Sequence, residues 1–352
     1  MKTETKRGCI AALTVLSLAA SAQAAELPNG SSRLKSKNTA WTLSTDDTEL
    51  TLAMASNTIS LTSLRNPAQK WNWITTPSQV PMPGVQTGKN YQKLNWEFRE
   101  ATEDTTNGHQ VTLRFTCADP ALELKSVWRA QPGPGPVENE MTIENASGAD
   151  ITFGPGIVAA GVDLVADGAV TLHRADKTAV GQGKVYQDVI GPNAKFSTGT
   201  SIIPLIILGV GSTHGAYLGF EWELGGFNVS SQTNTLRMTA SVHPITENVT
   251  RAKGDVFLIP NVYYGTYQGD IDDGSNRFKR WFWNHKITRS LHDNKDEPWV
   301  EVCMQEIGGK GNTSVTGSTP QDVYDRLAAT GAECVKMDFW DGSGKGWYNL
   351  RD

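Results

Sequence analysis

The sequence has little cysteine and little excess charge of either sign. Its four cysteines form no C-x-x-C pair, so structural zinc and thioredoxin-like redox chemistry have no support. A net charge of −5 argues against a nucleic-acid partner bound through a broad basic face. Charged residues make up 20% of the chain and aromatic residues 8%, a composition that excludes intrinsic disorder and favours a folded protein.

The sequence also lacks a long hydrophobic run, since no stretch after residue 24 reaches the ~18 consecutive apolar residues that a membrane helix needs. Residues 1–24 instead have the pattern of a secretory signal peptide. A basic start is followed by a short apolar run at 9–20 and by the small-x-small cleavage site Ala22-Gln23-Ala24. We therefore expect a secreted or periplasmic protein that begins at Ala25 and has no membrane partner.

Several catalytic and metal-binding motifs are absent as well. Neither a G-x-S-x-G nucleophile elbow nor an H-E-x-x-H zinc motif occurs. Residues 270–274 (Asp-Ile-Asp-Asp-Gly) resemble a calcium loop, but the glycine comes one position early and no glutamate ends the loop. A helix cap explains these aspartates better. The sequence therefore predicts no metal site and no cofactor.

Strand patterns separated by turn residues run from about Trp41 to Tyr267. Residues 49–54 and 58–61 are typical of a hairpin, residues 236–240 alternate between apolar and polar, and the Pro/Gly run at 131–136 marks a turn. We expect residues 25–271 to form a large antiparallel β-sandwich (a supersandwich). The 11 tryptophans of the chain are expected to fill cores rather than line sugar-binding clefts. Its further strands are expected at 111–117, 122–129, 138–143, 202–208, 216–224, 235–242 and 256–264.

The pattern changes after residue 271. Asp272 or Asp273 is positioned to cap a helix that runs to about Ile287, with aromatic residues on one side and basic residues such as Arg277 on the rest. A polar stretch that ends at Pro298 follows. Residues 272–298 are therefore expected to form a connector helix and a linker.

Residues 299–352 have the pattern of a β-loop-α-β unit, the building block of (β/α)8 barrels. Strands are expected at 299–304 and 333–337, with a helix between them that Thr319 caps and Gly331 ends. Two strands and one helix cannot bury both faces of a sheet, and a barrel takes roughly 250 residues. We therefore interpret this part as the first βαβ unit of a truncated barrel, although a small cap on the sandwich is the alternative.

The segment Asp338-Phe339-Trp340-Asp341 follows the second of these strands, at the edge where βα barrels carry their chemistry. An aromatic ring offers a flat apolar face to a pyranose, and carboxylates accept hydrogen bonds from its hydroxyl groups. This segment therefore predicts a carbohydrate site, with a solvated loop as the alternative.

The order of signal peptide, sandwich, basic aromatic helix and barrel start resembles the melibiase-type α-galactosidases of glycoside hydrolase family 36 and its relatives. Residues 277–285 resemble the connector between sandwich and barrel in that family, and Asn66-Pro67 with Trp71 also fits. The resemblance implies hydrolysis of α-galactosides or related α-glycosides by a retaining mechanism with two carboxyl groups. A fragment ending at Asp352 would be inactive, because at least one of these groups would lie beyond it.

Two roles stay open for Asp338. Lys336-Met337-Asp338 resembles the family's Lys-x-Asp motif, which would make Asp338 the nucleophile. By strand count Asp338 instead ends the second barrel strand, where the family has two consecutive aspartates that hold galactose hydroxyls; here Phe339 stands at the second position. We favour the sugar-holding role, with Lys336, Trp340 and Asp341 as further substrate-binding residues. A non-catalytic carbohydrate-binding sandwich is the alternative function.

The signal-peptide pattern makes a direct prediction about the mature N-terminus. Mass spectrometry of the exported protein should find Ala25, or a residue next to it, at the N-terminus. An Ala24→Leu variant should accumulate as the uncleaved precursor, because the site requires a small residue there. A folded cytoplasmic protein that keeps Met1 would contradict this prediction.

Overall fold

The structure is a computed structural model that describes residues 30–87, 90–106, 108–153, 157–176, 184–197, 202–221, 226–241, 249–286, 301–303, 325, 328–329 and 334–336. The chain divides into two compact units, residues 1–281 and 282–352, and the boundary falls inside helix α1 (Ile271–His285). No helix in the described ranges is long and apolar enough to cross a bilayer.

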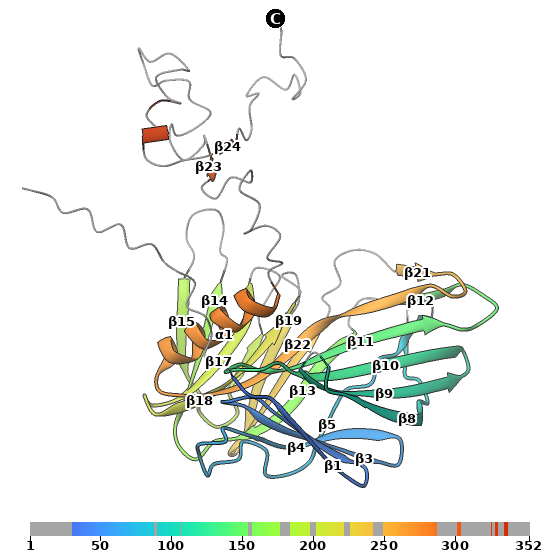
Figure 1. The fold of residues 1–352 in the computed structure, drawn as a ribbon, viewed down its shortest axis with the longest axis horizontal. Helices are drawn as coiled ribbons and strands as arrows, with labels where there is room; N and C mark the ends of the chain where they lie inside the picture. The colour runs from blue at the N-terminus through green and yellow to red at the C-terminus, as the bar shows by residue number, and fades with distance from the viewer. Residues whose placement is uncertain are drawn as a thin grey trace, which may run out of the picture. The chain divides into compact units, whose positions relative to one another are not determined.

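The largest sheet is antiparallel and has nine strands. Figure 1 shows its arrangement. Its strands, in spatial order, are β15 (Lys184–Val189), β14 (Val170–Asp176), β17 (Ile202–Val210), β18 (His214–Phe220), β22 (Val256–Gln268), β11 (Val137–Asn145), β10 (Ala121–Ala130), β9 (His109–Ala118) and β8 (Glu97–Asp104). Strands β15 and β8 are therefore the two edges of this sheet.

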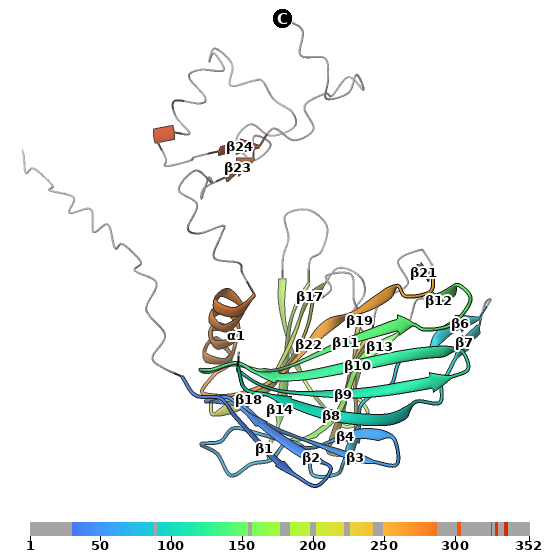
Figure 2. The ribbon, with the colours of Figure 1, turned by 45° about the vertical axis from the view of Figure 1, so that its right-hand side comes forward.

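Two smaller antiparallel sheets complete the sandwich (Figure 2). The five-stranded sheet consists of β1 (Arg33–Lys37), β2 (Ala40–Ser44), β3 (Glu49–Ala55), β4 (Thr58–Arg65) and β5 (Ser78–Gln79). The four-stranded sheet consists of β13 (Val158–Val165), β20 (Thr235–Ser241), β19 (Gly226–Gln232) and β16 (Lys195–Ser197). Two short pairs are β6 (Val85–Thr87) with β7 (Asn90–Gln92), and β12 (Ile151–Phe153) with β21 (Val249–Arg251).

One apolar core joins the three larger sheets. Its buried members come from all of them: Leu43 and Leu52, Val229 and Met238, Leu124 and Ile259. Burying a side chain of this size contributes roughly 1.5–3 kcal/mol. Trp41, Trp73, Trp96 and Trp128 are buried in the same core. The predicted antiparallel sandwich is confirmed.

The local predictions in this region are also confirmed. The hairpin expected at 49–61 forms as β3 and β4, where Ala55 pairs with Thr58. Ser56 and Asn57 between them both have positive φ, which is the two-residue turn that matches strand twist. The Pro/Gly run at 131–136 joins β10 to β11, with Ala130 paired to Val137.

Helix α1 packs on the outer face of the nine-stranded sheet, the face turned away from the core. Phe278 meets the rings of Tyr217 on β18 and Tyr263 on β22, at centroid distances of 5.5 and 5.7 Å. Trp281 lies 5.1 Å from Tyr263 and is 2% exposed. The aromatic side of the predicted helix is therefore its packed side.

Glycines make room for these rings. A Cβ atom at Gly265 on β22 would run into the ring of Tyr217, and one at Gly215 on β18 would run into the ring of Tyr267. Each tyrosine thus lies over a glycine of the neighbouring strand, because Tyr217 pairs with Gly265 and Gly215 with Tyr267. The flat surface that results is what α1 covers.

The cap of α1 lies two residues before the nearer of the two predicted caps, Asp272 and Asp273. The Asp270 carboxylate accepts hydrogen bonds from the backbone N–H groups of Asp272 and Asp273 at 2.9 and 3.1 Å. The Asp273 carboxylate in turn accepts one from the N–H of Asp270 at 3.2 Å. This reciprocal pattern is a capping box, so the cap is Asp270 and not Asp272 or Asp273. The sequence pattern placed it wrongly because all three aspartates suit a cap.

The tyrosine–glycine packing predicts the effect of a single methyl group. Gly265→Ala should lower the free energy of unfolding by roughly 1–3 kcal/mol, because the Tyr217 ring must shift. Urea unfolding followed by tryptophan fluorescence measures this. Gly148→Ala is the matched control, since its Cβ would meet nothing within 4 Å. Equal stability of the two variants would contradict the packing argument.

Candidate functional site

The sequence-predicted site belongs to the second unit, where two short strands are described. β23 (Glu301–Cys303) and β24 (Cys334–Lys336) pair in parallel, with Glu301 opposite Cys334 and Cys303 opposite Lys336. Asp325, Ala328 and Ala329, which lie between them in sequence, are helical. A parallel pair needs such a crossover, so the expected β-loop-α-β order is confirmed to this extent.

The parallel register places the carboxyl ends of both strands at one edge. Lys336 ends β24 directly opposite the end of β23. Asp338 follows two residues later in the sequence, and Trp340 and Asp341 follow it. These three residues lie outside the described part of the chain, so their predicted roles stay predictions.

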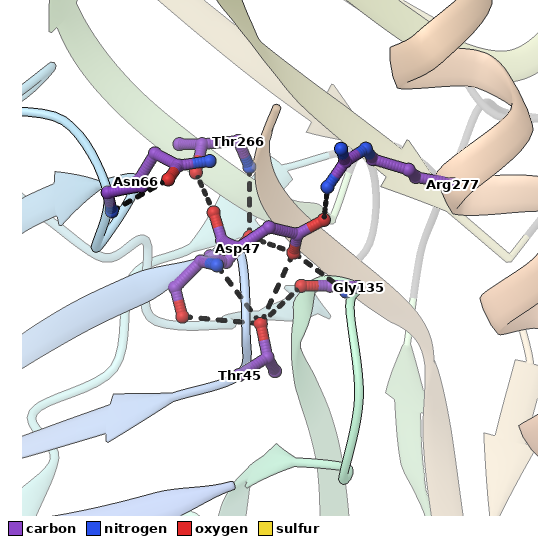
Figure 3. Close-up of polar contacts among 8 residues, drawn as sticks. Thr45, Asp47, Asn66, Gly135, Thr266 and Arg277 are labelled. Carbon is purple, nitrogen blue, oxygen red and sulfur yellow. Dashed lines mark hydrogen bonds and ion pairs between the residues drawn. The ribbon is translucent and has the colours of Figure 1, made fainter. Parts of the chain in front are cut away.

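A polar cluster that the sequence did not reveal lies under α1, centred on Asp47 (Figure 3). Asp47 is in the turn between β2 and β3, and 3% of it is exposed. Its carboxylate accepts a hydrogen bond from the Gly135 N–H at 2.7 Å and from the Arg277 guanidinium of α1 at 3.2 Å. The cluster therefore joins the β2–β3 turn, the β10–β11 loop and the helix.

Threonine hydroxyls complete the cluster. Thr45 donates to the Gly135 carbonyl at 2.7 Å, and the Thr266 hydroxyl on β22 donates to the carbonyl of Asp47. The Thr48 hydroxyl accepts a hydrogen bond from the Thr266 N–H at 3.0 Å. The buried turn thus finds partners on three other segments, which compensates for the removal of its polar groups from water.

The electrostatics of Asp47 are dominated by burial. Loss of hydration raises the pKa of Asp47 from its ordinary 3.8 to about 6, although the Gly135 N–H and Arg277 act in the opposite direction. Arg277 is 35% exposed at its side chain and remains partly hydrated. The sequence placed Arg277 on the polar side of the helix, where nothing distinguished it from the neighbouring basic residues.

One hollow on the described surface has no exposed aromatic ring on which a sugar could stack. This hollow of about 340 Å³ lies on the outer face of β8–β11 and is lined by charged residues such as Arg114, Glu123 and Lys125. Its one aromatic lining residue, Phe115, is only 1% exposed. A pyranose therefore finds no open ring face in this hollow.

The motif Asn66-Pro67 with Trp71 is structural in this sandwich. The Asn66 side-chain oxygen accepts a hydrogen bond from the Ala68 N–H at 3.0 Å and closes a local turn. The Trp71 ring N–H donates to the Val165 carbonyl at 3.0 Å, which ties this turn to β13. These residues hold segments of the sandwich together.

Comparison with solved structures identifies the fold. The galactosidase domain of the α-galactosidase–sucrose kinase AgaSK superposes with a TM-score of 0.64 and 14% identity, covering 86% of this chain and 50% of the other. The α-galactosidase from Lactobacillus brevis gives 0.63 and 11%, covering 87% and 49%. A variant of the family-36 enzyme AgaA from Geobacillus stearothermophilus, in complex with raffinose, gives 0.61 and 11%, covering 86% and 50%.

These likenesses establish the fold of the N-terminal part of family-36 α-galactosidases, and the resemblance inferred from the sequence is confirmed at that level. The chain spans about half the length of the solved chains that it matches. No protein-family model and no curated protein matches the sequence.

The raised pKa of Asp47 predicts a distinct pH dependence of stability. The folded pKa of about 6 exceeds the unfolded value of 3.8, so the folded state binds more protons between these values. The contribution of Asp47 to stability is therefore largest near pH 4 and is lost as the pH rises through 6, a change on the order of 3 kcal/mol. Asp47→Asn should remove this slope in urea unfolding measured from pH 4.5 to 7.5.

Asp163→Asn is the matched control for this prediction. Asp163 also pairs with an arginine, Arg237, at 2.7 Å, but its side chain is 34% exposed. Such a pair contributes at most about 1 kcal/mol, so the control should keep the wild-type slope. An unchanged slope in Asp47→Asn would show that Asp47 is not the titrating group.

Proposed function

We propose that this chain is the N-terminal part of a secreted glycoside hydrolase that acts on α-galactosides or related α-glycosides. The observation that carries the proposal is the superposition of 86% of the chain on the galactosidase domain of AgaSK. The described parallel pair β23–β24 after α1 supports it, because it has the strand order with which a (β/α)8 barrel begins. The export pattern of residues 1–24 supports secretion.

The proposed chemistry is retaining hydrolysis by two carboxyl groups. One acts as nucleophile and the other as general acid and base, roughly 5–5.5 Å apart. We assign Asp338 to the substrate site at the carboxyl edge of β24, where its carboxylate accepts hydrogen bonds from sugar hydroxyls. Trp340 supplies a ring face, and Asp341 and Lys336 supply further polar contacts.

The alternative role of Asp338 is that of the nucleophile. It is favoured by Lys336-Met337-Asp338, which matches the family's Lys-x-Asp motif. The position after the second strand favours the sugar-holding role instead. The two roles differ in what an external anion does, because azide replaces a missing nucleophile but cannot hold a sugar ring.

The gene decides between the enzyme and the non-catalytic alternative. Further βα units ending in carboxylates after codon 352 would support the hydrolase. A stop codon at that point would instead favour a carbohydrate-binding sandwich. The coding sequence beyond codon 352 also defines the full-length protein in which the kinetic experiment below is done.

Substitution of Asp338 tests its role in that protein. Asp338→Ala should weaken binding of an α-galactoside such as raffinose and slow turnover together, by at least roughly tenfold, because charged hydrogen bonds to hydroxyls are lost. Steady-state kinetics with and without azide measure both effects. We expect no rescue by azide.

Asp325→Ala is the matched control, since Asp325 is an exposed helical aspartate of the same segment. It should keep wild-type kinetics. Azide rescue of Asp338→Ala would establish the nucleophile role. Wild-type kinetics of Asp338→Ala would contradict both roles and show that Asp338 is not a site residue.

A further inference from the structure

The Tyr217 hydroxyl is a buried polar group on the outer face of β18. The residue is 2% exposed, and its hydroxyl has no hydrogen-bond partner among the described residues. Phe278 of α1 meets the ring at a centroid distance of 5.5 Å, so the helix covers it. Burying a hydroxyl without a partner is costly, because its hydrogen bonds to water are lost and not replaced. This group therefore calls for a partner.

The strand pairing brings the hydroxyl to the Asp47 cluster. Tyr217 pairs with Gly265 of β22, and the end of its ring and its hydroxyl occupy the space that a Cβ atom at Gly265 would take. The next residue of β22, Thr266, holds the β2–β3 turn. Its N–H donates to the Thr48 hydroxyl at 3.0 Å, and its own hydroxyl donates to the Asp47 carbonyl. The Tyr217 hydroxyl thus lies over the neighbour of the residue that binds this turn.

The charges of the cluster act on this hydroxyl. Burial raises the pKa of Tyr217, the negative charge of Asp47 raises it further, and the positive charge of Arg277 lowers it. The phenol therefore stays protonated and has one hydrogen bond to donate.

The Asp47 carboxylate has room for a further donor. Its Oδ1 accepts a hydrogen bond from the Gly135 N–H at 2.7 Å, and the hydroxyls of Thr45 and Thr48 lie 3.4 Å from it. Among the described residues, its Oδ2 has one donor, the Arg277 guanidinium at 3.2 Å. A carboxylate oxygen has two lone pairs, so Oδ2 can accept a second hydrogen bond.

We infer that an internal water molecule links the Tyr217 hydroxyl to Oδ2 of Asp47. The water accepts the hydrogen bond of the tyrosine and donates one to the carboxylate. Buried waters typically bridge polar groups that cannot reach each other directly, and they make two to four hydrogen bonds. The site adds β18 to the segments that the cluster joins, and it gives both groups the bond that each can still make.

Tyr217→Phe tests the link, since it removes the hydroxyl and keeps the ring. Without the tyrosine to hold it, the water no longer stabilises the charged form of Asp47, so the pKa of Asp47 should rise above its value of about 6. The loss of stability with rising pH should then end roughly 0.5–1 pH unit higher than in the wild type. Urea unfolding between pH 4.5 and 8 measures this shift.

Tyr264→Phe is the matched control. Tyr264 is 1% exposed, and its hydroxyl likewise has no partner among the described residues, but it lies on the inner face of the sheet, in the apolar core. This variant should keep the pH profile of the wild type. An unchanged profile in Tyr217→Phe would overturn the inference, and so would an equal shift in both variants, because the effect would then not be local to Asp47.

A high-resolution crystal structure of the chain gives a second readout. It should show one ordered water within hydrogen-bond distance of both the Tyr217 hydroxyl and Asp47 Oδ2, at about 2.5–3.0 Å from each oxygen. The same water should be absent from Tyr217→Phe. A direct hydrogen bond between the two side chains, or a site without water in the wild type, would overturn the inference.

Discussion

The contact between Asp47 and Arg277 fixes the arrangement of the first unit around α1. Removing a carboxylate from water is costly, and an ion pair alone does not offset that cost. Here the Gly135 N–H donates to the Asp47 carboxylate at 2.7 Å, and the Thr45 and Thr48 hydroxyls of the same turn donate to it at 3.4 Å. Because these groups come from the β2–β3 turn, the β10–β11 loop and the helix, none of the three segments is free to move without leaving a buried polar group unpaired. The helix that leads out of the sandwich is therefore held by a network as well as by apolar contact.

The outer face of the nine-stranded sheet changes from aromatic to charged along its length. Where α1 lies, glycines and tyrosines alternate across β18 and β22 and produce a flat aromatic layer. Towards β8 the same face is charged and hydrated, as in the hollow lined by Arg114 and Glu123. The difference follows from what each part meets: a helix covers the first part, and none of the described elements is packed over the charged hollow.

A scaffold can be retained at 11–14% identity because burial pattern and turn chemistry, rather than particular residues, specify it. Chemistry is more demanding, since it requires particular carboxyl groups at particular places. The sandwich described here accounts for the shared fold, whereas the proposed activity rests on the predicted site where Asp338 follows β24 in the sequence. The connector helix α1 packs on the sandwich, and in the sequence it precedes the βα unit that carries the predicted site.

The sequence by itself determined the antiparallel sandwich, the hairpin at 49–61, the turn at 131–136, the connector helix and the βαβ order after it. These features depend on local periodicity and on turn residues, which a single chain displays directly. Only the tertiary structure decided that Asp270 is the helix cap, that Arg277 is bound and that Asp47 is buried. Asp47 in a polar turn and Arg277 in a basic helix are 230 residues apart, and nothing local marks them as partners. The sequence also did not show that β15 is an edge strand. Whether a strand is central or at an edge depends on the order of the strands in the sheet, which only the tertiary structure gives.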